Sequence, residues 1–353
     1  MNTSSQRNIK VGIIGATGYT GQELLGILFR HSKVDIVFVS SESNEGQSLS
    51  QNFPQFKSEL KFINLSQSKS FNANDLDLVF FTTPNNIAVN NAKDFLDKGI
   101  SVIDFSADFR LKTNEEYAKY YGFEHKDLDL LKSACYGLVE QKRKEIQKLK
   151  KPFLIANPGC YTTASNLALL PICSYKKDVF DFNSIIINGA SGVSGAGKKL
   201  DQSLSFNEAN ENFKAYNIAG KHRHTPEINM VLSEAAKREI KVSFTPHLIP
   251  MFRGLLVTCY INTKENFDLK NFFKHYKDYY ENDFFINIFE LGLLPETKLT
   301  NKNNSCFIGM DHDKDCNRLI ICSTIDNLVK GAAGQAVQSM NLAYGFHETL
   351  GLV

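Results

Sequence analysis

Over the first 156 residues, short and almost continuous apolar runs alternate with segments of helical spacing. Such runs are typical of parallel strands that are covered on both faces, and the segments between them repeat apolar residues at helical intervals. Strands separated by helices in this way predict βαβ units and a parallel sheet. We expect strands at 10–14, 34–39, 76–81, 100–103 and 153–156, and helices at 22–31 and 87–98.

The pattern changes after residue 156, where longer strand candidates and helices follow one another without regular alternation. This predicts an α+β second domain after an α/β first domain. The helical segment 331–350 is expected to pack back on the first domain, and the Lys/Gln-rich stretch 141–151 to form an exposed helix. The expected domains are 1–156 with about 327–353, and 157–326. In the second domain we expect strands at 184–187, 255–262 and 319–325, and helices at 161–171, 226–238 and 269–280.

Length and charge narrow the classes of protein that this chain can represent. Its 353 residues are enough for two domains with their own cores. With 40 basic and 38 acidic side chains, the net charge of +2 gives no field that would attract nucleic acid or anionic lipid. No apolar run approaches the roughly 18 residues that span a bilayer. The polar start, residues 1–10, is expected to be a frayed tail and no signal peptide.

The seven cysteines separate further hypotheses. An odd number, widely spread and without an export signal, argues against a disulfide framework and predicts a cytoplasmic protein. No two cysteines have CxxC spacing, so we expect no structural metal. Free cysteines are usually small buried hydrophobic residues, and only their surroundings can mark one as reactive. They occupy positions 135, 160, 173, 259, 306, 316 and 322.

A glycine-rich turn directly follows the first predicted strand and opens a helix. The residues Gly15-Ala16-Thr17-Gly18-Tyr19-Thr20-Gly21 match GxxGxxG, a spacing variant of the dinucleotide-binding fingerprint. Glycines here allow a tight turn and let main-chain N–H groups approach a pyrophosphate at the positive end of the helix. The sequence therefore predicts a dinucleotide site in the first domain.

The end of the second predicted strand bears on the choice between NAD and NADP. Sites for NAD usually have Asp or Glu there, but this strand ends in Ser40-Ser41, and Asp35 lies at its beginning. Small hydroxyl side chains tolerate a 2′-phosphate that a carboxylate would repel. The sequence favours NADP(H), although Glu42 is close by and no Arg is.

One cysteine occupies a setting that the other six lack. In Asn157-Pro158-Gly159-Cys160-Tyr161-Thr162-Thr163, Pro and Gly end a strand, and Thr162 or Thr163 is a candidate cap for the next helix. Cys160 is therefore expected at or just before a helix N-terminus, where the dipole and free N–H groups stabilise a thiolate and an oxyanion. Such a thiolate is a nucleophile for an acyl group, whereas the alternative is a half-buried thiol that packs the turn.

A pair of histidines is the candidate for moving protons. In Lys221-His222-Arg223-His224-Thr225-Pro226, Thr225 is a natural N-cap and Pro226 a natural first helical residue, so both histidines are expected on the preceding loop. An imidazole there can exchange protons near neutral pH. The alternative is a solvated basic loop, and His247 is a lesser candidate base.

Two further segments are candidate ligand loops. Residues 189–199 gather small side chains and two lysines after a strand, which suits a phosphate or cofactor, or else forms a flexible solvent loop. Residues 104–110, DFSADFR, follow a strand end, where ligands of open α/β sheets collect. Arg110 is placed there to clamp a substrate carboxylate, or to pair with Asp108 or Asp104 and hold the loop.

These segments, in this order, resemble the N-acetyl-gamma-glutamyl-phosphate reductases of arginine biosynthesis, which are related to the aspartate-semialdehyde dehydrogenases. The resemblance implies a Rossmann-type dinucleotide-binding domain, an α+β catalytic and oligomerisation domain, and a homo-oligomer, dimer or tetramer. It also implies NADPH-dependent reduction of an acyl phosphate to an aldehyde, with release of phosphate. The matching stretches are GATGYTGQEL, DFSADFRL, NPGCYTT, GASGVSGAGKK, AYNIAGKHRHTPEI, TPHLIPMFRGLL and DNLVKGAAGQAVQ.

Residue by residue, the resemblance assigns roles in that reaction. Cys160 corresponds to the nucleophile that forms a thioester, and His222 to the acid/base, ahead of His224. The substrate-binding positions are Arg110, Tyr216, His224 and Glu227. The cofactor-binding positions are Gly15, Thr17, Gly18, Tyr19, Thr20, Gly21, Ser191 and Asn327, together with Ser40 and Ser41 from the strand end.

Other functions remain as alternatives. A reductase of N-acetyl-aminoadipyl phosphate in lysine biosynthesis would use the same chemistry on a chain one methylene longer, a difference of only about 1–3 kcal/mol in a pocket. A non-catalytic dinucleotide-binding sensor would need neither Cys160 nor His222. An aldehyde dehydrogenase that forms the acid would need a general base for water, and its usual chain is longer.

Two segments depart from the pattern of the family. Pro84-Asn85-Asn86 stands where the family commonly has Pro-His-Gly, and Val139 stands where it usually has Pro. Neither departure involves the expected nucleophile.

Overall fold

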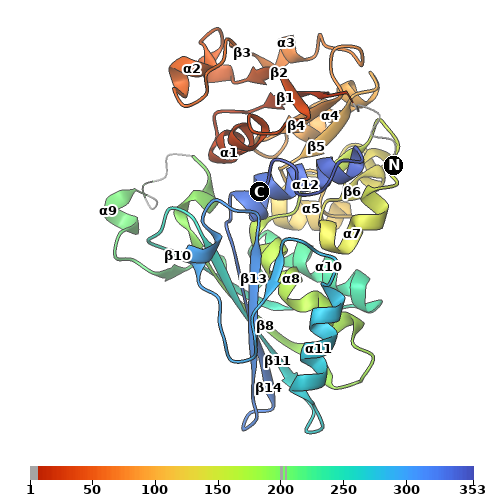
Figure 1. Ribbon diagram of the computed structural model, residues 1–353, viewed down its shortest axis with the longest axis vertical. Helices are drawn as coiled ribbons and strands as arrows, with labels where there is room; N and C mark the ends of the chain where they lie inside the picture. The colour runs from red at the N-terminus through yellow and green to blue at the C-terminus, as the bar shows by residue number, and fades with distance from the viewer. Residues whose placement is uncertain (1–6, 199–201, 203–204) are drawn as a thin grey trace. The chain divides into compact units, whose positions relative to one another are not determined.

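The computed structural model describes residues 7–198, 202 and 205–353. Residues 1–6 of the polar start and Lys199 of the predicted glycine-rich loop lie outside the described residues. The chain divides into two compact units (Figure 1). The first unit comprises Met1–Lys112, Glu124–Pro158 and Ala333–Val353, and the second comprises Thr113–Phe123 and Gly159–Ala332.

The first unit is built on one parallel sheet. Its strands are β1 (Ile9–Ile14), β2 (Val34–Ser40), β3 (Phe62–Ile63), β4 (Leu78–Phe81), β5 (Ser101–Asp104), β6 (Cys135–Tyr136) and β7 (Leu154–Ala156). Their order is β3-β2-β1-β4-β5-β7-β6, and all neighbouring pairs are parallel. Every residue of β4 and β5 is buried, because helices cover such sheets on both faces. The strand order changes direction between β1 and β4, where open parallel sheets bind ligands at the carboxyl ends.

The helices of the first unit connect these strands. They are α1 (Tyr19–Leu28), α2 (Leu49–Asn52), α3 (Leu65–Ser68), α4 (Ala88–Leu96), α6 (Leu128–Ser133), α7 (Val139–Ile146) and α12 (Gly334–Ala343), with a short 3₁₀ turn at Glu42–Asn44. Helix α12, from the end of the chain, packs on α1 and α7. The first unit therefore contains a helix that is more than 170 residues distant in sequence from its other elements.

The second unit is built on a mixed sheet with longer strands. Its strands are β8 (Phe180–Gly192), β9 (Lys214–Ala215), β10 (Ser243–Ile249), β11 (Leu255–Thr263), β12 (Ile286–Ile288), β13 (Cys306–Asp313) and β14 (Arg318–Ile325). Their order is β12-β13-β14-β11-β8-β10-β9. The pairs β8/β10 and β12/β13 are parallel, and the other neighbours are antiparallel.

The second unit also contains α-helices. They are α5 (Asn114–Tyr121), α8 (Cys160–Ser174), α9 (Phe206–Ala209), α10 (His224–Ala236) and α11 (Leu269–Tyr279). Helix α8 packs on β11, β14 and α10, and its residues 161–172 are all buried. Along β11, buried and half-buried residues alternate, as expected where only one face of a sheet is covered. Figure 1 shows α8, α10 and α11 on the same side of the long strands.

The predicted fold class is confirmed, with corrections in detail. The parallel sheet and the mixed second sheet both form, and the helix at 141–151 is α7 at Val139–Ile146. The helix expected at 331–350 is wrong in extent, since α12 ends at Ala343 and Gly345, with φ of 75°, turns the chain. Strands β10 and β13 were not predicted, because Pro246 and Gly309 interrupt their apolar patterns.

Candidate active site

The glycine-rich turn lies between β1 and α1 in the first unit, and each glycine meets a separate requirement. Gly15 has φ of 84°, a conformation that other residues rarely adopt. Gly18 is the N-cap of α1. A Cβ at Gly21 would lie 2.8 Å from the backbone of Ala16, so only glycine lets the helix pack this closely on the turn. The residues after the cap, Tyr19 and Thr20, form the first turn of α1, which contains no acidic side chain. This N-terminus therefore suits a phosphate.

The end of β2 lies beside this turn. The carbonyl of Ser40 accepts the N–H groups of Gly15 and Ala16 at 3.2 and 3.0 Å. The Ser41 hydroxyl lies 3.4 Å from that of Thr17 and is almost fully buried. Three of the predicted cofactor residues, Thr17, Ser40 and Ser41, are thus brought together with the glycines.

The carboxylates near β2 are engaged elsewhere. Glu42 Oε1 accepts the N–H of Leu65, the first residue of α3, at 2.9 Å. Asp35 Oδ1 accepts a hydrogen bond from Asn8 at the opposite end of the strand. These contacts satisfy both acidic side chains within the protein and leave the hydroxyl of Ser41 beside the turn.

Cys160 is the first residue of α8, as the sequence predicted. Gly159 is its N-cap in an extended conformation, and the first turn of α8 has no acidic residue. The predicted capping by Thr162 or Thr163 is wrong, because the Thr163 N–H and hydroxyl both donate to the carbonyl of Gly159. Cys160 is half-buried at a helix start without an acidic residue, and the positive end of a helix dipole favours a thiolate.

The predicted cap of α10 is also wrong. The helix begins at His224 with Arg223 as its N-cap, so Thr225 and Pro226 lie inside the first turn. His222 lies just before the helix, and its Nδ1 accepts the N–H of His224 at 3.0 Å. The neutral ring of His222 therefore carries its proton on Nε2.

The two histidines differ in their surroundings. Burial, helped by the charge of Arg223, lowers the pKa of His222 from 6.5 to about 4. The ring of His222 lies among those of Tyr161, Tyr216 and Phe244, at centroid distances of 5.6, 5.5 and 5.2 Å.

His224 lies against the turn that carries the cysteine. A Cβ added to Gly159 would be only 2.4 Å from its Nε2. The imidazole can come this close only because residue 159, the neighbour of Cys160 in the chain, is glycine. Among the two histidines, His224 is the one that directly contacts the cap of α8.

Glu227 connects the histidine helix to the cysteine turn. It lies in the first turn of α10, is fully buried, and its Oε1 accepts the N–H of Gly159 at 2.9 Å. The carboxylate therefore fixes the N-cap of α8 and the start of α10 relative to each other.

Two tyrosines complete this cluster. The hydroxyl of Tyr161 donates to the carbonyl of His247 at 3.0 Å. Burial raises the pKa of Tyr216 to about 12, and the neighbouring Cys160 also raises it. His247, the lesser candidate base, directs Nδ1 to the carbonyl of Gly189 at 3.1 Å. The structure thus brings together Cys160, Tyr216, His222, His224 and Glu227.

Ser191 and Asn327 lie around the glycine-rich segment that follows β8. Asn327 donates to Ser194 Oγ at 2.9 Å and accepts the N–H of Gly254 at 2.8 Å. A Cβ at Gly195 would lie 3.1 Å from Ser191 Oγ and 3.8 Å from Asn327 Nδ2. Both predicted residues are buried and line one stretch of main chain in the second unit.

Arg110 lies in the first unit, where main-chain carbonyls hold its guanidinium. Its Nε donates to Asn157 at 2.8 Å and its Nη2 to Phe105 at 2.6 Å. Burial raises the pKa of Asp104, and the charge of Arg110 opposes this rise. Asp108 accepts the N–H groups of Asn86 and Val89, each at 3.0 Å. The DFSADFR segment therefore ties together the loops that follow β4 and β5.

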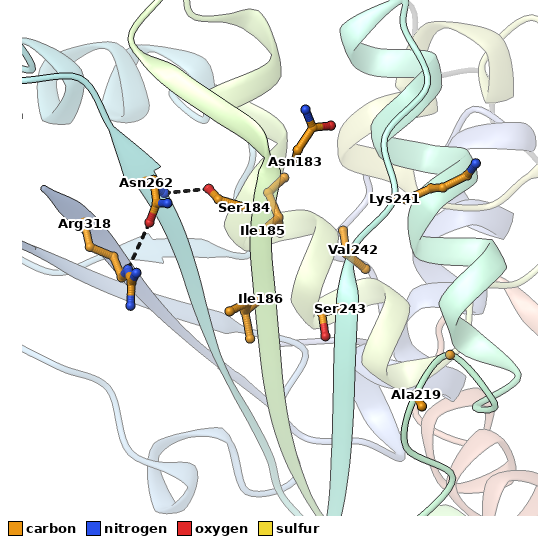
Figure 2. Close-up of a pocket in the computed structure, with 11 residues that line it drawn as sticks. Asn183, Ser184, Ile185, Ile186, Ala219, Lys241, Val242, Ser243, Asn262 and Arg318 are labelled. Atoms are coloured by element: carbon orange, nitrogen blue, oxygen red, sulfur yellow. Dashed lines mark hydrogen bonds between the residues drawn. The ribbon is translucent and has the colours of Figure 1, made fainter. Parts of the chain in front are cut away.

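A separate cavity of about 460 Å³ lies in the second unit (Figure 2). Within it, Asn262 donates from its main chain to Ser184 Oγ and accepts a hydrogen bond from Arg318. None of the sequence-predicted site residues lines this cavity. Its lining residues are Asn183, Ser184, Ile185, Ile186, Ala219, Gly220, Lys241, Val242, Ser243, Asn262 and Arg318.

Two features of the described residues bear on other classes of function. Within residues 7–198, 202 and 205–353, no three His, Cys, Asp or Glu side chains gather in a way that could hold a metal ion. No helix in the same part of the chain combines the length and the apolar character needed to cross a membrane.

A glycine cradle at a helix N-terminus in one unit, and a cysteine with two histidines in the other, are typical of an enzyme that combines a dinucleotide with a thiol. Residues 10–149 match the family model for the semialdehyde dehydrogenase NAD binding domain, and residues 160–327 match that for the semialdehyde dehydrogenase dimerisation domain. The chain belongs to the semialdehyde dehydrogenase family.

The names of curated relatives are more specific than the family models. Proteins named N-acetyl-gamma-glutamyl-phosphate reductase from Campylobacter jejuni and Clostridium novyi are each 45% identical, over 98% of this chain and 98% of theirs. Among solved structures, aspartate semialdehyde dehydrogenase II of Vibrio cholerae complexed with ASA has a TM-score of 0.73 at 20% identity, covering 96% of this chain and 98% of that one. The enzyme of Candida albicans with NADP has a TM-score of 0.68 at 16% identity, covering 96% and 99%.

Sequence reasoning missed one residue near the cysteine. Gly331 contacts Cys160 so closely that an added Cβ would lie 2.7 Å from that of the cysteine. The stretch DNLVKGAAGQ contains it, but a glycine among small residues gives no sign of a partner that is 171 positions away.

Proposed function

We propose that this protein reduces N-acetyl-gamma-glutamyl phosphate with NADPH to N-acetylglutamate 5-semialdehyde, with release of phosphate, in arginine biosynthesis. The observation that carries the proposal is Cys160 at the first position of α8, beside two histidines. The relatives that share 45% of their residues over 98% of the chain have the corresponding name. This activity belongs in the cytoplasm, where thiols stay reduced.

Cys160 is the nucleophile in this proposal. Its thiolate attacks the acyl carbon, the bond from that carbon to the phosphate oxygen breaks, and phosphate leaves with the electron pair. The product on the protein is a thioester. N–H groups in the first turn of α8 stabilise the oxyanion that forms during the attack.

NADPH, held by the turn from Gly15 to Gly21, would supply a hydride to the acyl carbon of the Cys160 thioester, which would become a thiohemiacetal on the cysteine. The C–S bond of that intermediate then breaks, which releases the aldehyde and returns the thiolate. The same helix start stabilises the oxyanion in both additions, because both form at the carbon attached to Cys160.

For the acid/base, the sequence placed His222 before His224, and the geometry supports the reverse order. His224 contacts the cap of α8 through Nε2, next to Cys160. His222, with a pKa of about 4, stays neutral near pH 7 and is poorly matched to proton exchange there. We therefore assign proton transfer to His224. We propose that His222 stays neutral and donates a hydrogen bond from Nε2–H.

We propose that the first unit binds NADP(H) and that the second unit carries the catalytic residues, as expected from the sequence. A Cβ at Gly15 would lie 2.9 Å from the Thr82 carbonyl and one at Gly21 2.8 Å from the Ala16 backbone, so the tight turn needs both glycines, and its helix N-terminus suits a pyrophosphate. The hydroxyl of Ser41 lies beside that of Thr17, and a hydroxyl, unlike a carboxylate, does not repel a 2′-phosphate. Ser191 and Asn327 are proposed for the nicotinamide end, and Arg110, Tyr216 and Glu227 for the substrate pocket.

We also propose that the chain forms a homodimer or tetramer through the uncovered face of the second sheet. The family model over residues 160–327 is that of a dimerisation domain. Ile186 of β8 is 41% exposed on this face, although its neighbours Ile185 and Ile187 are buried.

The reverse reaction provides the direct test of the activity. The purified chain is expected to reduce NADP⁺ when given N-acetylglutamate 5-semialdehyde and phosphate, followed at 340 nm, and to lose the rate when phosphate is omitted. Cys160→Ser should lower the rate by about 10³-fold or more, since the thioester route is lost. A Cys160→Ser rate close to wild type contradicts the proposal.

Two comparisons refine the test. The N-acetyl-aminoadipyl analogue should react more slowly by about 10-fold or more, as one methylene in a pocket allows. Faster turnover of that analogue would assign the protein to the lysine-pathway reaction. His224→Asn should reduce kcat more than His222→Asn, and the opposite order would return the acid/base role to His222.

A further inference from the structure

Gly331 lies directly against Cys160. A Cβ at position 331 would lie 2.7 Å from Cys160 Cβ and 3.2 Å from its Cα. It would also be 3.3 Å from Cδ1 of Ile325. A Cβ atom essentially never comes within 3.0 Å of a heavy atom in a distant part of the chain. Any side chain at 331 therefore forces a displacement.

The main chain around Gly331 has little freedom to move away. Its N–H donates to the carbonyl of Asp326 at 2.9 Å. The buried carboxylate of Asp326 accepts the N–H groups of Leu328 and Val329 and a bond from Arg253 at 2.9 Å. Residues 326–331 are thereby fixed by one carboxylate from within the second unit.

The segment also has an unusual helical geometry. Residues Val329–Ala333 form a π-helical turn, which contains one more residue per turn than an α-helix. Such turns are often found at functional sites, where the extra residue redirects the chain. Here the turn contains Gly331, the residue that touches the cysteine.

Cys160 is equally restrained on its own side. The Gly159 N–H donates to the buried Glu227, and the Gly159 carbonyl accepts the N–H of Thr163 at 2.8 Å. Residues 161–172 of α8 are all buried, so the helix cannot shift as a body without disturbing the core. The two restrained segments meet where Gly331 faces Cys160.

We infer that Gly331 is a positioning residue for Cys160, because its missing side chain sets where the thiol lies at the start of α8. This inference rests on the proposed role of Cys160 as nucleophile. A methyl group at 331 displaces the Cβ of Cys160 and with it Sγ, so attack on the acyl carbon is misaligned. A misplacement of about 1 Å can cost on the order of 100-fold in rate.

The test compares Gly331→Ala with Gly26→Ala as a matched control. A Cβ at Gly26 meets nothing nearer than 3.8 Å, so this variant is expected to keep wild-type kinetics. For Gly331→Ala we expect kcat in the phosphate-dependent reverse reaction to fall about 10- to 100-fold. The KM values for NADP⁺ and phosphate should stay within about twofold, since cofactor and phosphate binding do not depend on Sγ. An unchanged kcat overturns the inference.

A second measurement covers the case in which Gly331→Ala folds poorly. If the contact with Cys160 causes the damage, Gly331→Ala should lower the urea midpoint much less in a Cys160→Gly background, where the opposing Cβ is gone. An equal loss in both backgrounds overturns the inference, because the clash then lies elsewhere.

The two proposals fail in different ways. If Cys160→Ser retains the wild-type rate, the proposed nucleophile is wrong. If Cys160→Ser abolishes the rate while Gly331→Ala leaves kcat unchanged, only the role of Gly331 is wrong.

Discussion

His222 and His224 are two positions apart, yet their environments give them different chemistry. His222 is buried among three aromatic rings, which explains why its pKa falls to about 4. His224 begins α10 and lies against Gly159. The sequence could identify the pair, because a loop with two imidazoles before a helix is recognisable. It could not rank them, because the ranking depends on contacts with Gly159 and Tyr161, more than 60 positions earlier in the chain, and with Phe244 on a later strand.

The low pKa of His222 makes stability depend on pH. An ordinary histidine has a pKa of 6.5, so between pH 6.5 and about 4 the unfolded chain binds more protons than the folded one. The stability that neutral His222 contributes to the folded state is therefore fully present above pH 6.5 and is lost as the pH falls towards 4. Its full size is on the order of 3 kcal/mol. In urea unfolding, His222→Asn should show a smaller loss of stability between pH 7 and 4.5 than wild type.

A matched control for this measurement is His347→Asn, because His347 is exposed near the end of the chain. This variant should lose stability on acidification as wild type does. If His222→Asn and wild type lose the same free energy of unfolding over this pH range, His222 is not the group that titrates.

Asn86 shows how a departure from the family pattern is accommodated. The family commonly has glycine at this position, and Asn86 has φ of 70°, in the left-handed region. Asn is the residue that most readily replaces glycine there. Its N–H still donates to Asp108, so the loop after β4 keeps its tie to the DFSADFR segment.

At the scale of elements, α1 contains two glycines with opposite requirements. A Cβ at Gly21 would lie 2.8 Å from the backbone of Ala16, whereas one at Gly26 would meet nothing nearer than Arg30 Nη1 at 3.8 Å. In a helix, Ala is more stabilising than Gly by about 0.5–1 kcal/mol. Gly26→Ala should therefore raise the urea midpoint, and Gly21→Ala should lower it and weaken NADP⁺ binding measured by calorimetry. Equal effects at both positions would contradict the assigned packing of α1 on the turn.

The end of β2 carries the proposed choice of cofactor. Ser41→Asp places a carboxylate beside Thr17, where it would repel a 2′-phosphate and accept bonds from a ribose diol. We expect kcat/KM for NADP⁺ to fall about 10-fold or more while that for NAD⁺ is kept or improved. The control is Ser66→Asp, an exposed position in α3 that adds the same charge. If Ser41→Asp leaves the ratio of the two cofactors unchanged, Ser41 does not contact the 2′ position.

Helix ends were predicted less well than helices. Thr225-Pro226 has the pattern of a cap and a first helical residue, but α10 starts two residues earlier, at His224, whose N–H donates to His222. Likewise α8 starts at Cys160, with Gly159 as its N-cap, although two threonines follow. In both cases a contact that no local pattern reveals decides where the helix begins.

At the scale of the whole chain, the parallel sheet was predictable and the mixed sheet only in part. Strands β4 and β5 are buried throughout, so their continuous apolar runs identify them. Strand β13 contains Gly309, where a Cβ would lie 2.2 Å from the carbonyl of Leu293. The glycine that weakens its strand pattern is required by this close crossing of another segment, which the sequence does not show.

The uncovered face of the second sheet carries an apolar row that crosses three strands. Ile186 of β8 pairs with Tyr260 of β11, and Tyr260 pairs with Ile320 of β14. All three are exposed or half-buried, although both sequence neighbours of Ile186 and of Ile320 are buried on the helix-covered side. A self-complementary patch of this kind is what a two-fold dimer requires.

Light scattering after gel filtration tests this surface. The wild-type chain should have a mass of at least twice 39.7 kDa at micromolar concentration, whereas Ile186→Lys should approach the mass of one chain. Phe284→Lys, at a position that is 60% exposed outside this row, should leave the mass unchanged. If Ile186→Lys keeps the wild-type mass, or if the wild-type chain is itself a monomer, this face does not join two copies, and the exposed isoleucine needs another explanation.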